Sequence, residues 1–383
     1  MDESKNLHLF FSDLVVETRL FKEAEYTLKN AILSHVYALG LLKNSLSKKE
    51  QHSSGLEILR IKLVIESARN WAVTKFKIIR MIFIVLSLVQ YGLYACRVCY
   101  RLKTGTVSIH NLALLPLGCC IKLIFRVKLI YLPHELETER SGVRGILKFL
   151  MKIAEKCCIG YASHTVTVCP PITQWYMDLY QIRNVHTVRN VPAKRQLAIT
   201  NDVTDIREKF NILDDELVFI YQGLLSEGRG IALVIESFQR AKKKIVLMGH
   251  GDLAREIQDN SSKYISYLKP VLAHNICAQT AKADVGIHIN QDESLSYKYS
   301  LPNKFFEYVH AGIPIIVSPN MEFLSDLVVS HNLGWVIDPE NLADFLLGLE
   351  LNQCADKRAS LLQYASSAVY ENDAKAFKTV YSS

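Results

Sequence analysis

The feature that most constrains the fold is a regular alternation of strand-like and helix-like segments that begins near Glu216. Apolar runs of strand length occur at 217–223, 244–251, 263–270, 284–290 and 313–318, and segments of helical period occur at 230–241, 273–283, 302–312 and 322–332. Strands separated by helices of about 10 to 15 residues predict right-handed βαβ units and a parallel sheet. The C-terminal half is therefore expected to form a Rossmann-like domain.

The N-terminal half has a similar but less regular pattern. Strands are predicted at 7–11, 106–111, 127–135 and 164–169, and a strand followed by a linker is predicted at 185–193. Helices are predicted at 17–35 and 143–159, helical patterns run through 56–101, and a polar loop is predicted at 43–55. A chain of 383 residues is too long for one ordinary core, which favours two domains. The predicted domains are residues 1–195 and 196–365, and a helix within 366–383 is expected to cross back to the N-terminal domain.

The charge of the chain is divided unevenly. Residues 1–200 contain 28 Lys and Arg against 14 Asp and Glu, whereas residues 201–383 contain 17 against 24. A basic half indicates an anionic neighbour, such as membrane headgroups, nucleic acid or a charged polymer, although a solvated basic surface is an equal alternative. The nine cysteines include one isolated Cys96-x-x-Cys99 pair and no second metal-ligand pair. This odd number, with no signal-peptide pattern, favours a reducing cytoplasm.

The apolar segment 81–96 is flanked by basic residues. A membrane-spanning helix needs about 20 apolar residues, and this run is shorter. The leading interpretation is a helix buried in the protein. A helix lying at a membrane interface is the second alternative, and a membrane span is the third.

Ligands of open parallel sheets bind beyond the carboxyl ends of the strands. Residues 224–230 form a glycine-containing turn before a helix, where Arg229 could hold a phosphate or simply lie at the surface. Gly249-x-Gly251 follows the next strand and is typical either of a close approach to a ligand or of an ordinary turn. Lys304 and Glu307 are three residues apart on one helix face, as a ligand-binding pair or as an exposed ion pair.

The segments "YQGLLSEGRG", "MGHG", "ADVGI" and "SLPNKFFEYVHAGIPIIVS", in this order, resemble the retaining glycosyltransferases of family 4. In the N-terminal half, "VETRLFKEAEYTL", "SIHNLALLPLG" and "LIYLPHELETE" resemble the bacterial surface-polysaccharide branch of that family, which makes lipopolysaccharide or capsule. The resemblance covers nearly the whole chain. It implies an α/β protein of the GT-B fold, in which two Rossmann-like domains with parallel sheets face a central cleft.

The resemblance also implies roles for individual residues. Glu307 would bind the ribose hydroxyls, Arg229 and Lys304 would bind the diphosphate, and His134 would face the donor sugar as the catalytic residue. The implied donor-binding residues are Gly223, Arg229, Gly249, Gly251, Ser300, Leu301, Lys304 and Glu307, and those on the acceptor side are Arg19, His110 and Glu135. The chain departs from the family pattern at Tyr299, Leu224 and Leu132, where the family commonly has Glu, Arg and Asp.

The resulting expectation is a hexosyltransferase-type enzyme that transfers a sugar, with retention, from a UDP- or GDP-sugar to a polysaccharide or lipid-linked glycan. It would be cytoplasmic and peripheral to an anionic membrane, would bind no nucleic acid, and would need neither a cofactor nor a metal. Asp292 and Glu293 are expected to lie in a solvated loop. Two alternatives remain open: a GT-B epimerase or phosphorylase, and a catalytically impaired donor-binding or scaffold subunit.

Overall fold

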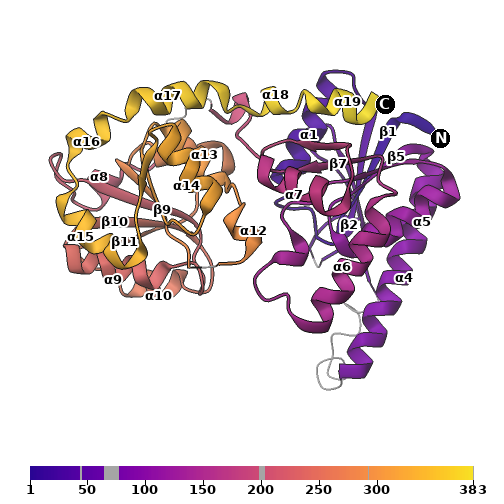
Figure 1. The fold of residues 1–383 in the computed structure, drawn as a ribbon, viewed down its shortest axis with the longest axis horizontal. Coiled ribbons are helices and arrows are strands. Elements are labelled where there is room, and N and C mark those ends of the chain that lie inside the picture. The colour runs from indigo at the N-terminus through magenta and orange to yellow at the C-terminus, as the bar shows by residue number, and fades with distance from the viewer. Residues whose placement is uncertain (44, 64–76, 198–202, 292, 383) are drawn as a thin grey trace. The chain divides into compact units, whose positions relative to one another are not determined.

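The computed structural model describes residues 1–43, 45–63, 77–197, 203–291 and 293–382. The chain forms two compact units (Figure 1). The first unit contains Met1–Val188 and Asp373–Ser383, and the second unit contains Arg189–Asn372. The chain thus leaves the first unit after residue 188, where the sequence placed the boundary after 195, and returns to it at residue 373.

The first unit is built on an eight-stranded sheet of order β3-β4-β2-β1-β5-β6-β7-β8. Only β3 is antiparallel to its neighbour among the pairings of this sheet in the described residues. The strand order reverses between β1 and β5, which makes this edge the topological switch point of the sheet. The strands are β1 Asp2–Leu9, β2 His35–Leu41, β3 Lys49–Gln51, β4 Glu57–Ile61, β5 Thr104–Ile109, β6 Lys128–Tyr131, β7 His164–Thr167 and β8 Val185–Thr187.

Helices cover the sheet of the first unit, and their ends follow local sequence signals. Helices α5 and α7 have proline in the first turn, where a missing backbone N–H costs no helical hydrogen bond. The last helix, α19, buries Phe377, Val380 and Tyr381 in this unit. The helices are α1 Thr18–Lys29, α4 Lys77–Leu102, α5 Leu115–Phe125, α6 Gly145–Ile159, α7 Pro170–Tyr180 and α19 Ala376–Ser382, with short 3₁₀ turns at η1 Leu112–Leu114 and η2 Glu137–Glu139.

The second unit has a six-stranded parallel sheet of order β11-β10-β9-β12-β13-β14, and its switch point lies between β9 and β12. The strands are β9 Val218–Leu224, β10 Lys244–His250, β11 Ile265–Leu268, β12 Val285–His288, β13 Ile315–Val317 and β14 Gly334–Val336. The α-helices are α8 Ile206–Lys209, α9 Ile231–Ala241, α10 Ala254–Asp259, α11 Ile276–Thr280, α12 Leu295–Lys298, α13 Asn303–Ala311, α14 Glu322–Ser330, α15 Leu342–Gly348, α16 Leu351–Ala355, α17 Arg358–Ser367 and α18 Tyr370–Asp373, and the 3₁₀ turns are η3 Lys194–Leu197, η4 Ala273–Asn275 and η5 Pro339–Asn341.

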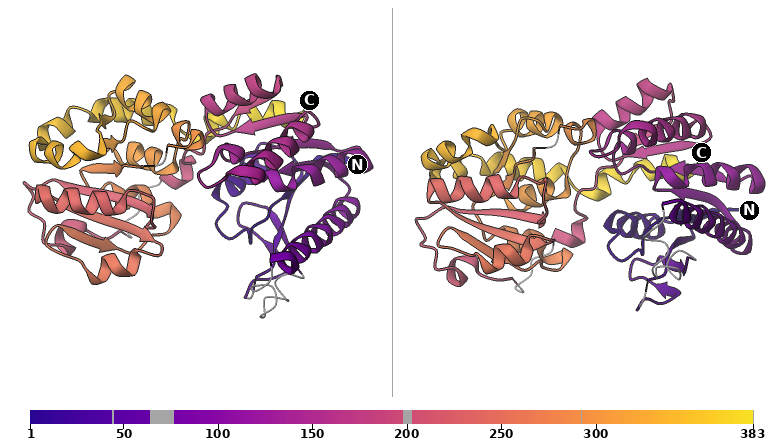
Figure 2. Two further views of the ribbon diagram at one scale, coloured as in Figure 1. Left: turned by 60° about the horizontal axis from the view of Figure 1, so that its bottom comes forward. Right: turned by 90° about the horizontal axis from the view of Figure 1, so that it is seen from below.

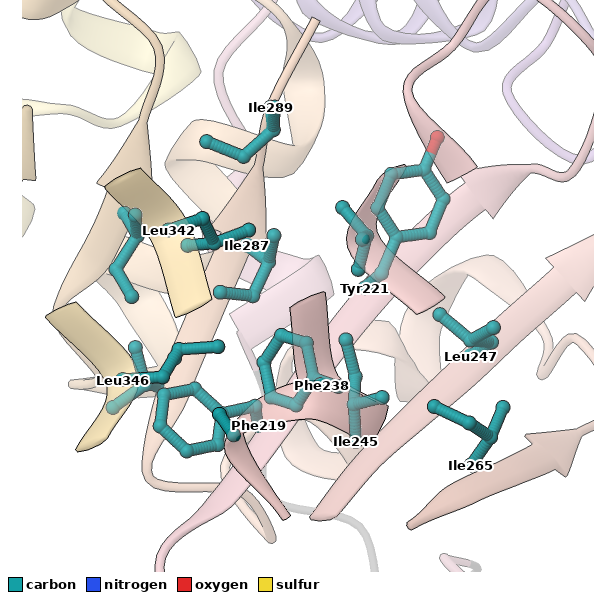
Figure 3. Packing of buried hydrophobic residues seen from close by; sticks show 14 of the residues in the cluster. Phe219, Tyr221, Phe238, Ile245, Leu247, Ile265, Ile287, Ile289, Leu342 and Leu346 are labelled. Carbon is teal, nitrogen blue, oxygen red and sulfur yellow. The ribbon is translucent and has the colours of Figure 1, made fainter. Parts of the chain in front are cut away.

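One face of the second sheet packs on α9 and α15 through a hydrophobic core (Figure 3). Phe219 of β9 meets Phe238 of α9 edge to face, with ring centroids 5.0 Å apart. Helix α13 packs on the sheet through Tyr308, whose hydroxyl donates to the carbonyls of Ile220 and Ile287. A Cβ on Gly286 would lie 2.5 Å from the Tyr308 ring, so glycine is required there. These contacts fix the start of α13 at the switch point.

The N-terminal prediction needs three corrections. The helical patterns predicted for 56–101 are wrong at their start, because Glu57–Ile61 is strand β4, with alternate residues buried. The predicted loop 43–55 contains strand β3, and the predicted helix 17–35 ends at Lys29, before strand β2. The helical prediction for 64–76 lies outside the described residues.

Helix α4 contains the apolar segment for which a buried helix was expected, and it runs along the outside of the first unit (Figure 2). Only one of its faces is buried. Tyr91 and Ala95 are buried, whereas Val89 and Leu93 are exposed. Among the described residues, one helix, Phe83–Leu102, is long and apolar enough to cross a membrane by length and composition, and 33% of its apolar window is buried. The expectation of a buried helix therefore holds for one face of α4 and not for the other.

Candidate functional site

A cavity of about 390 Å³ lies in the second unit at the carboxyl ends of β9 and β10, next to the N-terminus of α13. We call it the β9 pocket. Its position beside the strand-order reversal is where open α/β sheets bind ligands. It is lined by Gln222, Gly223, Met248, Gly249, His250, Pro270, Val271, Ile276, Pro302, Asn303, Lys304 and Glu307.

Lys304 supplies the cation of the β9 pocket. Its Nζ lies 4.0 Å from the centroid of the Tyr221 ring, is buried, and has no hydrogen-bond acceptor among the described residues. Burial and, second, the charge of Arg229 lower the pKa of Lys304 to about 7, and Glu307 opposes this shift. A buried amine without an acceptor destabilises the protein. An anion in this pocket would supply the missing hydrogen-bond acceptor and the opposite charge.

Glu307 lines the same pocket and is held by Gln222, which the sequence analysis did not identify. An ionised carboxylate only accepts hydrogen bonds, so Gln222 Nε2 is the donor to Glu307 Oε2, and Gln222 Oε1 lies 2.6 Å from Thr280 Oγ1. The carboxylate is therefore oriented through a buried amide at the end of β9. The available signal was a lone amide side chain in the otherwise apolar strand "VFIYQGL".

Arg229 lies in the turn between β9 and α9 and does not line the β9 pocket. Its charge nevertheless acts there, because it lowers the pKa of Lys304 and contributes to the lowered pKa of His288. His288 is buried at the end of β12, and neither ring nitrogen has a hydrogen-bond partner in the described chain. The end of the sheet therefore concentrates positive charge and unpaired donors.

The other predicted donor-binding residues divide into two groups. Gly223 and Gly249 line the β9 pocket, and a Cβ on Gly249 would lie 1.8 Å from the carbonyl oxygen of Gly223. Gly251, Ser300 and Leu301 do not line it. Gly251 instead packs against the Leu225 backbone, and the Ser300 hydroxyl donates to the Tyr297 carbonyl. Leu301 is buried.

A second cavity, of about 240 Å³, lies in the first unit at the carboxyl ends of β1, β5 and β6. We call it the β1 pocket. Arg19 is absent from its lining: its guanidinium is buried and donates to the carbonyls of Pro133 and Val166. The lining residues are Phe10, Phe11, Ser12, Glu17, His110, Asn111, His134, Glu135, Glu137 and Arg140.

His134, His110 and Glu135 meet in the β1 pocket. His134 Nε2 lies 3.1 Å from His110 Nδ1. Burial, followed by the charge of Arg19, lowers the pKa of His134 to about 3, so its ring is neutral at physiological pH. Glu135 forms an ion pair with Arg140 over 3.3 Å.

The described residues contain no cluster of three or more His, Cys, Asp or Glu side chains that could hold a metal ion. Asp292 lies outside the described residues. All nine cysteines are free thiols in the part of the chain that the structure covers.

Residues 216–350, which include every residue of the β9 pocket, match the family model described as "Glycosyl transferases group 1". No curated protein matches the sequence. Sucrose-phosphate synthase from Thermosynechococcus elongatus is similar in structure, with a TM-score of 0.74 and 13% identity over 99% of this chain and 98% of that chain. Anabaena HepE in complex with UDP-glucose has a TM-score of 0.69 and 12% identity, over 99% and 98% of the two chains.

WaaG, a glycosyltransferase involved in lipopolysaccharide biosynthesis, has a TM-score of 0.65 and 13% identity, over 98% of this chain and 99% of that chain. At such identities the similarity concerns the fold, and it extends over both units. The matches together support a GT-B glycosyltransferase: the chain has the GT-B fold, and its second unit carries the segment that matches the group 1 glycosyl transferases.

Proposed function

We propose that the protein is a retaining hexosyltransferase that uses a UDP- or GDP-sugar as its donor. The observation that carries the proposal is the buried Nζ of Lys304, which lacks an acceptor within the described part of the chain and lies in the same pocket as the Glu307 carboxylate. A cation and a carboxylate at the ends of parallel strands match the two polar parts of a nucleotide, its phosphates and its ribose hydroxyls. The structure of HepE with UDP-glucose, which shares this fold, supports the choice of donor.

The proposed roles follow from charge. Lys304 would contact the diphosphate, and Arg229 would act on it from the neighbouring turn. Negative charge develops on the diphosphate as the sugar departs, so fixed positive groups stabilise the transition state more than the ground state. Glu307, held by Gln222, would accept hydrogen bonds from the ribose hydroxyls. This chemistry requires no metal and no cofactor.

We further propose that the acceptor is a polysaccharide or lipid-linked glycan and that the protein lies on the cytoplasmic face of an anionic membrane. The support is an exposed apolar surface on the first unit, where α5 contacts both α4 and α6. Apolar side chains exposed in such numbers, in a basic half of the chain, suit a membrane interface. The surface comprises Ile146, Leu147, Phe149, Leu150 and Ile153 on α6, Val85, Val89 and Leu93 on α4, and Leu123 and Ile124 on α5.

The donor proposal is tested by calorimetric titration with UDP, GDP and their sugar conjugates, after a thermal-shift screen has selected the base. Lys304→Met and Glu307→Ala are each expected to weaken nucleotide binding about tenfold or more, because each removes a charged partner. Lys263→Met, which changes an exposed lysine of the same unit, is the matched control and should bind as the wild type does. Unchanged affinity in both pocket variants would refute the site.

The membrane proposal is tested by flotation with anionic and neutral vesicles at low salt. The double variant Leu147→Ser, Leu150→Ser should lose vesicle binding, because both side chains are more than half exposed. The matched control is Leu213→Ser, Leu362→Ser, which removes equally exposed leucines from the second unit. Wild-type protein that stays unbound with anionic vesicles, or equal losses in both double variants, would remove this part of the proposal.

A further inference from the structure

Three histidines form a continuous chain behind the β1 pocket. His8 lies in β1, His110 follows β5 and His134 follows β6, so each comes from one of three adjacent strands. His8 Nδ1 is 2.8 Å from His110 Nε2, and His110 Nδ1 is 3.1 Å from His134 Nε2. His8 and His110 are almost fully buried, whereas the ring of His134 lines the pocket.

The inner end of this chain is the amide of Asn6. Asn6 Nδ2 is 2.8 Å from His8 Nε2 and 2.9 Å from the hydroxyl of Tyr381 in α19. The Tyr381 hydroxyl donates to Glu23 Oε1 over 2.5 Å. The Ser108 hydroxyl donates to Asn6 Oδ1 over 3.1 Å, and its oxygen also lies 3.0 Å from Asn6 Nδ2.

These contacts determine which nitrogen of each ring carries the proton. Because Tyr381 gives its proton to Glu23, its oxygen accepts from Asn6 Nδ2. Asn6 Nδ2 also contacts the Ser108 hydroxyl, but an amide nitrogen cannot accept a hydrogen bond, so its 2.8 Å contact with His8 Nε2 requires that Nε2 be the acceptor. A neutral imidazole has one donor and one acceptor, so His8 donates from Nδ1. By the same rule, His110 accepts at Nε2 and donates from Nδ1, and His134 accepts at Nε2 and carries its proton on Nδ1.

All three rings are neutral in this environment. Burial lowers the pKa of His8 and of His134 to about 3, and the charge of Arg19 contributes to both shifts. The pKa of His110 is also lowered well below its usual range, chiefly by burial. Glu23 Oε1 is 3.9 Å from His8 Nε2, beyond hydrogen-bond distance, so the carboxyl does not replace Asn6 as the partner of His8.

We infer that Asn6, His8 and His110 are positioning residues that hold His134 in the Nδ1–H tautomer, so that the β1 pocket receives its ligand with a neutral hydrogen-bond donor. Within the described residues His134 is hydrogen-bonded through Nε2, so Nδ1 is the ring nitrogen left for a ligand. The ligand group is an oxygen that accepts a hydrogen bond. Under the proposed function, on which this identification rests, it is a hydroxyl or ether oxygen of a sugar.

The same arrangement excludes His134 as a general base. To accept a proton at Nδ1, His134 would have to carry its own proton on Nε2, and His110 would have to supply that proton. His110 would then need a proton from His8, and His8 would need one from Asn6. A primary amide has no proton that it releases at physiological pH, so the transfer ends at Asn6. The inference thus assigns His134 to binding a polar oxygen and not to removing a proton from an acceptor hydroxyl.

The tautomer is measured on the full chain without any substrate, by long-range ¹H–¹⁵N correlation after selective ¹⁵N-histidine labelling, with His134 assigned from its absence in His134→Asn. We expect a protonated Nδ1 and an unprotonated Nε2 at His134 between pH 6 and pH 8. Asn6→Asp replaces the donor with an acceptor and should reverse the direction of the hydrogen bonds between the three histidines. The proton of His134 would then move to Nε2. Thr106→Val, which removes a buried hydroxyl of β5 that has no partner among the described residues, should leave the tautomer unchanged.

A wild-type His134 protonated on Nε2 would overturn the inference, as would an unchanged His134 tautomer in a folded Asn6→Asp protein. If Asn6→Asp does not fold, the wild-type measurement still decides. With a donor and acceptor in hand, His134→Asn, which keeps a side-chain donor, should retain activity that His134→Leu loses roughly ten- to hundredfold in kcat/KM. Equal losses in the two variants would refute the donor role. Absence of sugar transfer in the wild type would refute the proposed function and leave the tautomer result standing.

Discussion

Binding of a nucleotide sugar is expected to be coupled to the uptake of a proton by Lys304. The pKa of Lys304 in the free protein is about 7, because its amine is buried and lies near Arg229. A bound diphosphate would bring two negative charges to this amine and raise its pKa toward the ordinary lysine range. With a free pKa of about 7, binding should take up roughly 0.1 proton at pH 6, 0.5 at pH 7 and 0.9 at pH 8.

The direction of the pH dependence follows from this uptake. Since the complex holds more protons than the free protein, affinity falls as pH rises, by up to about tenfold per pH unit above the free pKa. The diphosphate of a sugar nucleotide lacks the monoester proton that titrates near about pH 6, so the ligand itself does not obscure the effect. Calorimetric titration at pH 6, 7 and 8, in buffers of different ionisation enthalpy, measures the number of protons taken up.

Lys304→Arg separates this explanation from others. Arginine stays charged at all these pH values, so the variant should bind with little proton uptake and a flat pH profile. Lys263→Met, in the same unit, should behave as the wild type does. Tight binding by the wild type at pH 8 with no proton uptake, or undiminished uptake in Lys304→Arg, would refute the reasoning.

Two further predictions concern a glycine of the second unit and a buried carboxyl group of the first unit. Gly249→Ala should lower both the melting temperature and the nucleotide affinity, because its Cβ would lie 1.8 Å from the Gly223 carbonyl oxygen. The control Gly348→Ala, which has open space around its Cβ, should change neither quantity. Equal effects of the two substitutions would show that the close approach of Gly249 to Gly223 is unimportant. Burial raises the pKa of Glu23 from 4.5 to about 7, so its contribution to stability is complete below pH 4.5 and is lost as pH rises through 7. Glu23→Gln should therefore stabilise the protein at pH 8 by up to about 3 kcal/mol and much less at pH 5, and equal melting-temperature gains at both pH values would contradict this.

The second unit could be predicted from sequence because each of its elements carries its own period. Helix α13, expected within 302–312, runs from Asn303 to Ala311, and its stop at Gly312 agrees with the left-handed backbone there. The strands before and after it are short apolar runs bounded by turn residues, and they occur where the pattern placed them. Local signals were sufficient for these elements.

The first unit was harder to predict because its signals are short or mixed. Strand β4 has only five residues and includes Glu57 and Arg60, so its alternation was not recognised within a longer helical pattern. His8 lies within the predicted strand 7–11 and Asn6 lies directly before it, and neither was expected to be a site residue. Their partner Tyr381 comes from the other end of the chain, and no local pattern can reveal such a contact.

For the β9 pocket, the sequence identified the two charged side chains. It did not identify the uncharged side chains that orient the carboxylate. Lys304 and Glu307 could be identified from their position on a short helix after a strand, and both line the β9 pocket. Gln222 and Thr280, which orient the carboxylate, lie on separate elements and are joined only by the fold. Arg19 was expected near the acceptor, but it binds backbone carbonyls within the first unit.

The return of the chain at residue 373 has a consequence for biosynthesis. The ribosome makes all of the second unit before it makes α19, so the second unit can fold while the first is still missing a helix. Until then Phe377, Val380 and Tyr381 cannot fill their places in the core, and the amide of Asn6 lacks one of its partners. The hydrogen bonds behind the β1 pocket are therefore completed only after α19 has been made, which is later than the whole of the second unit.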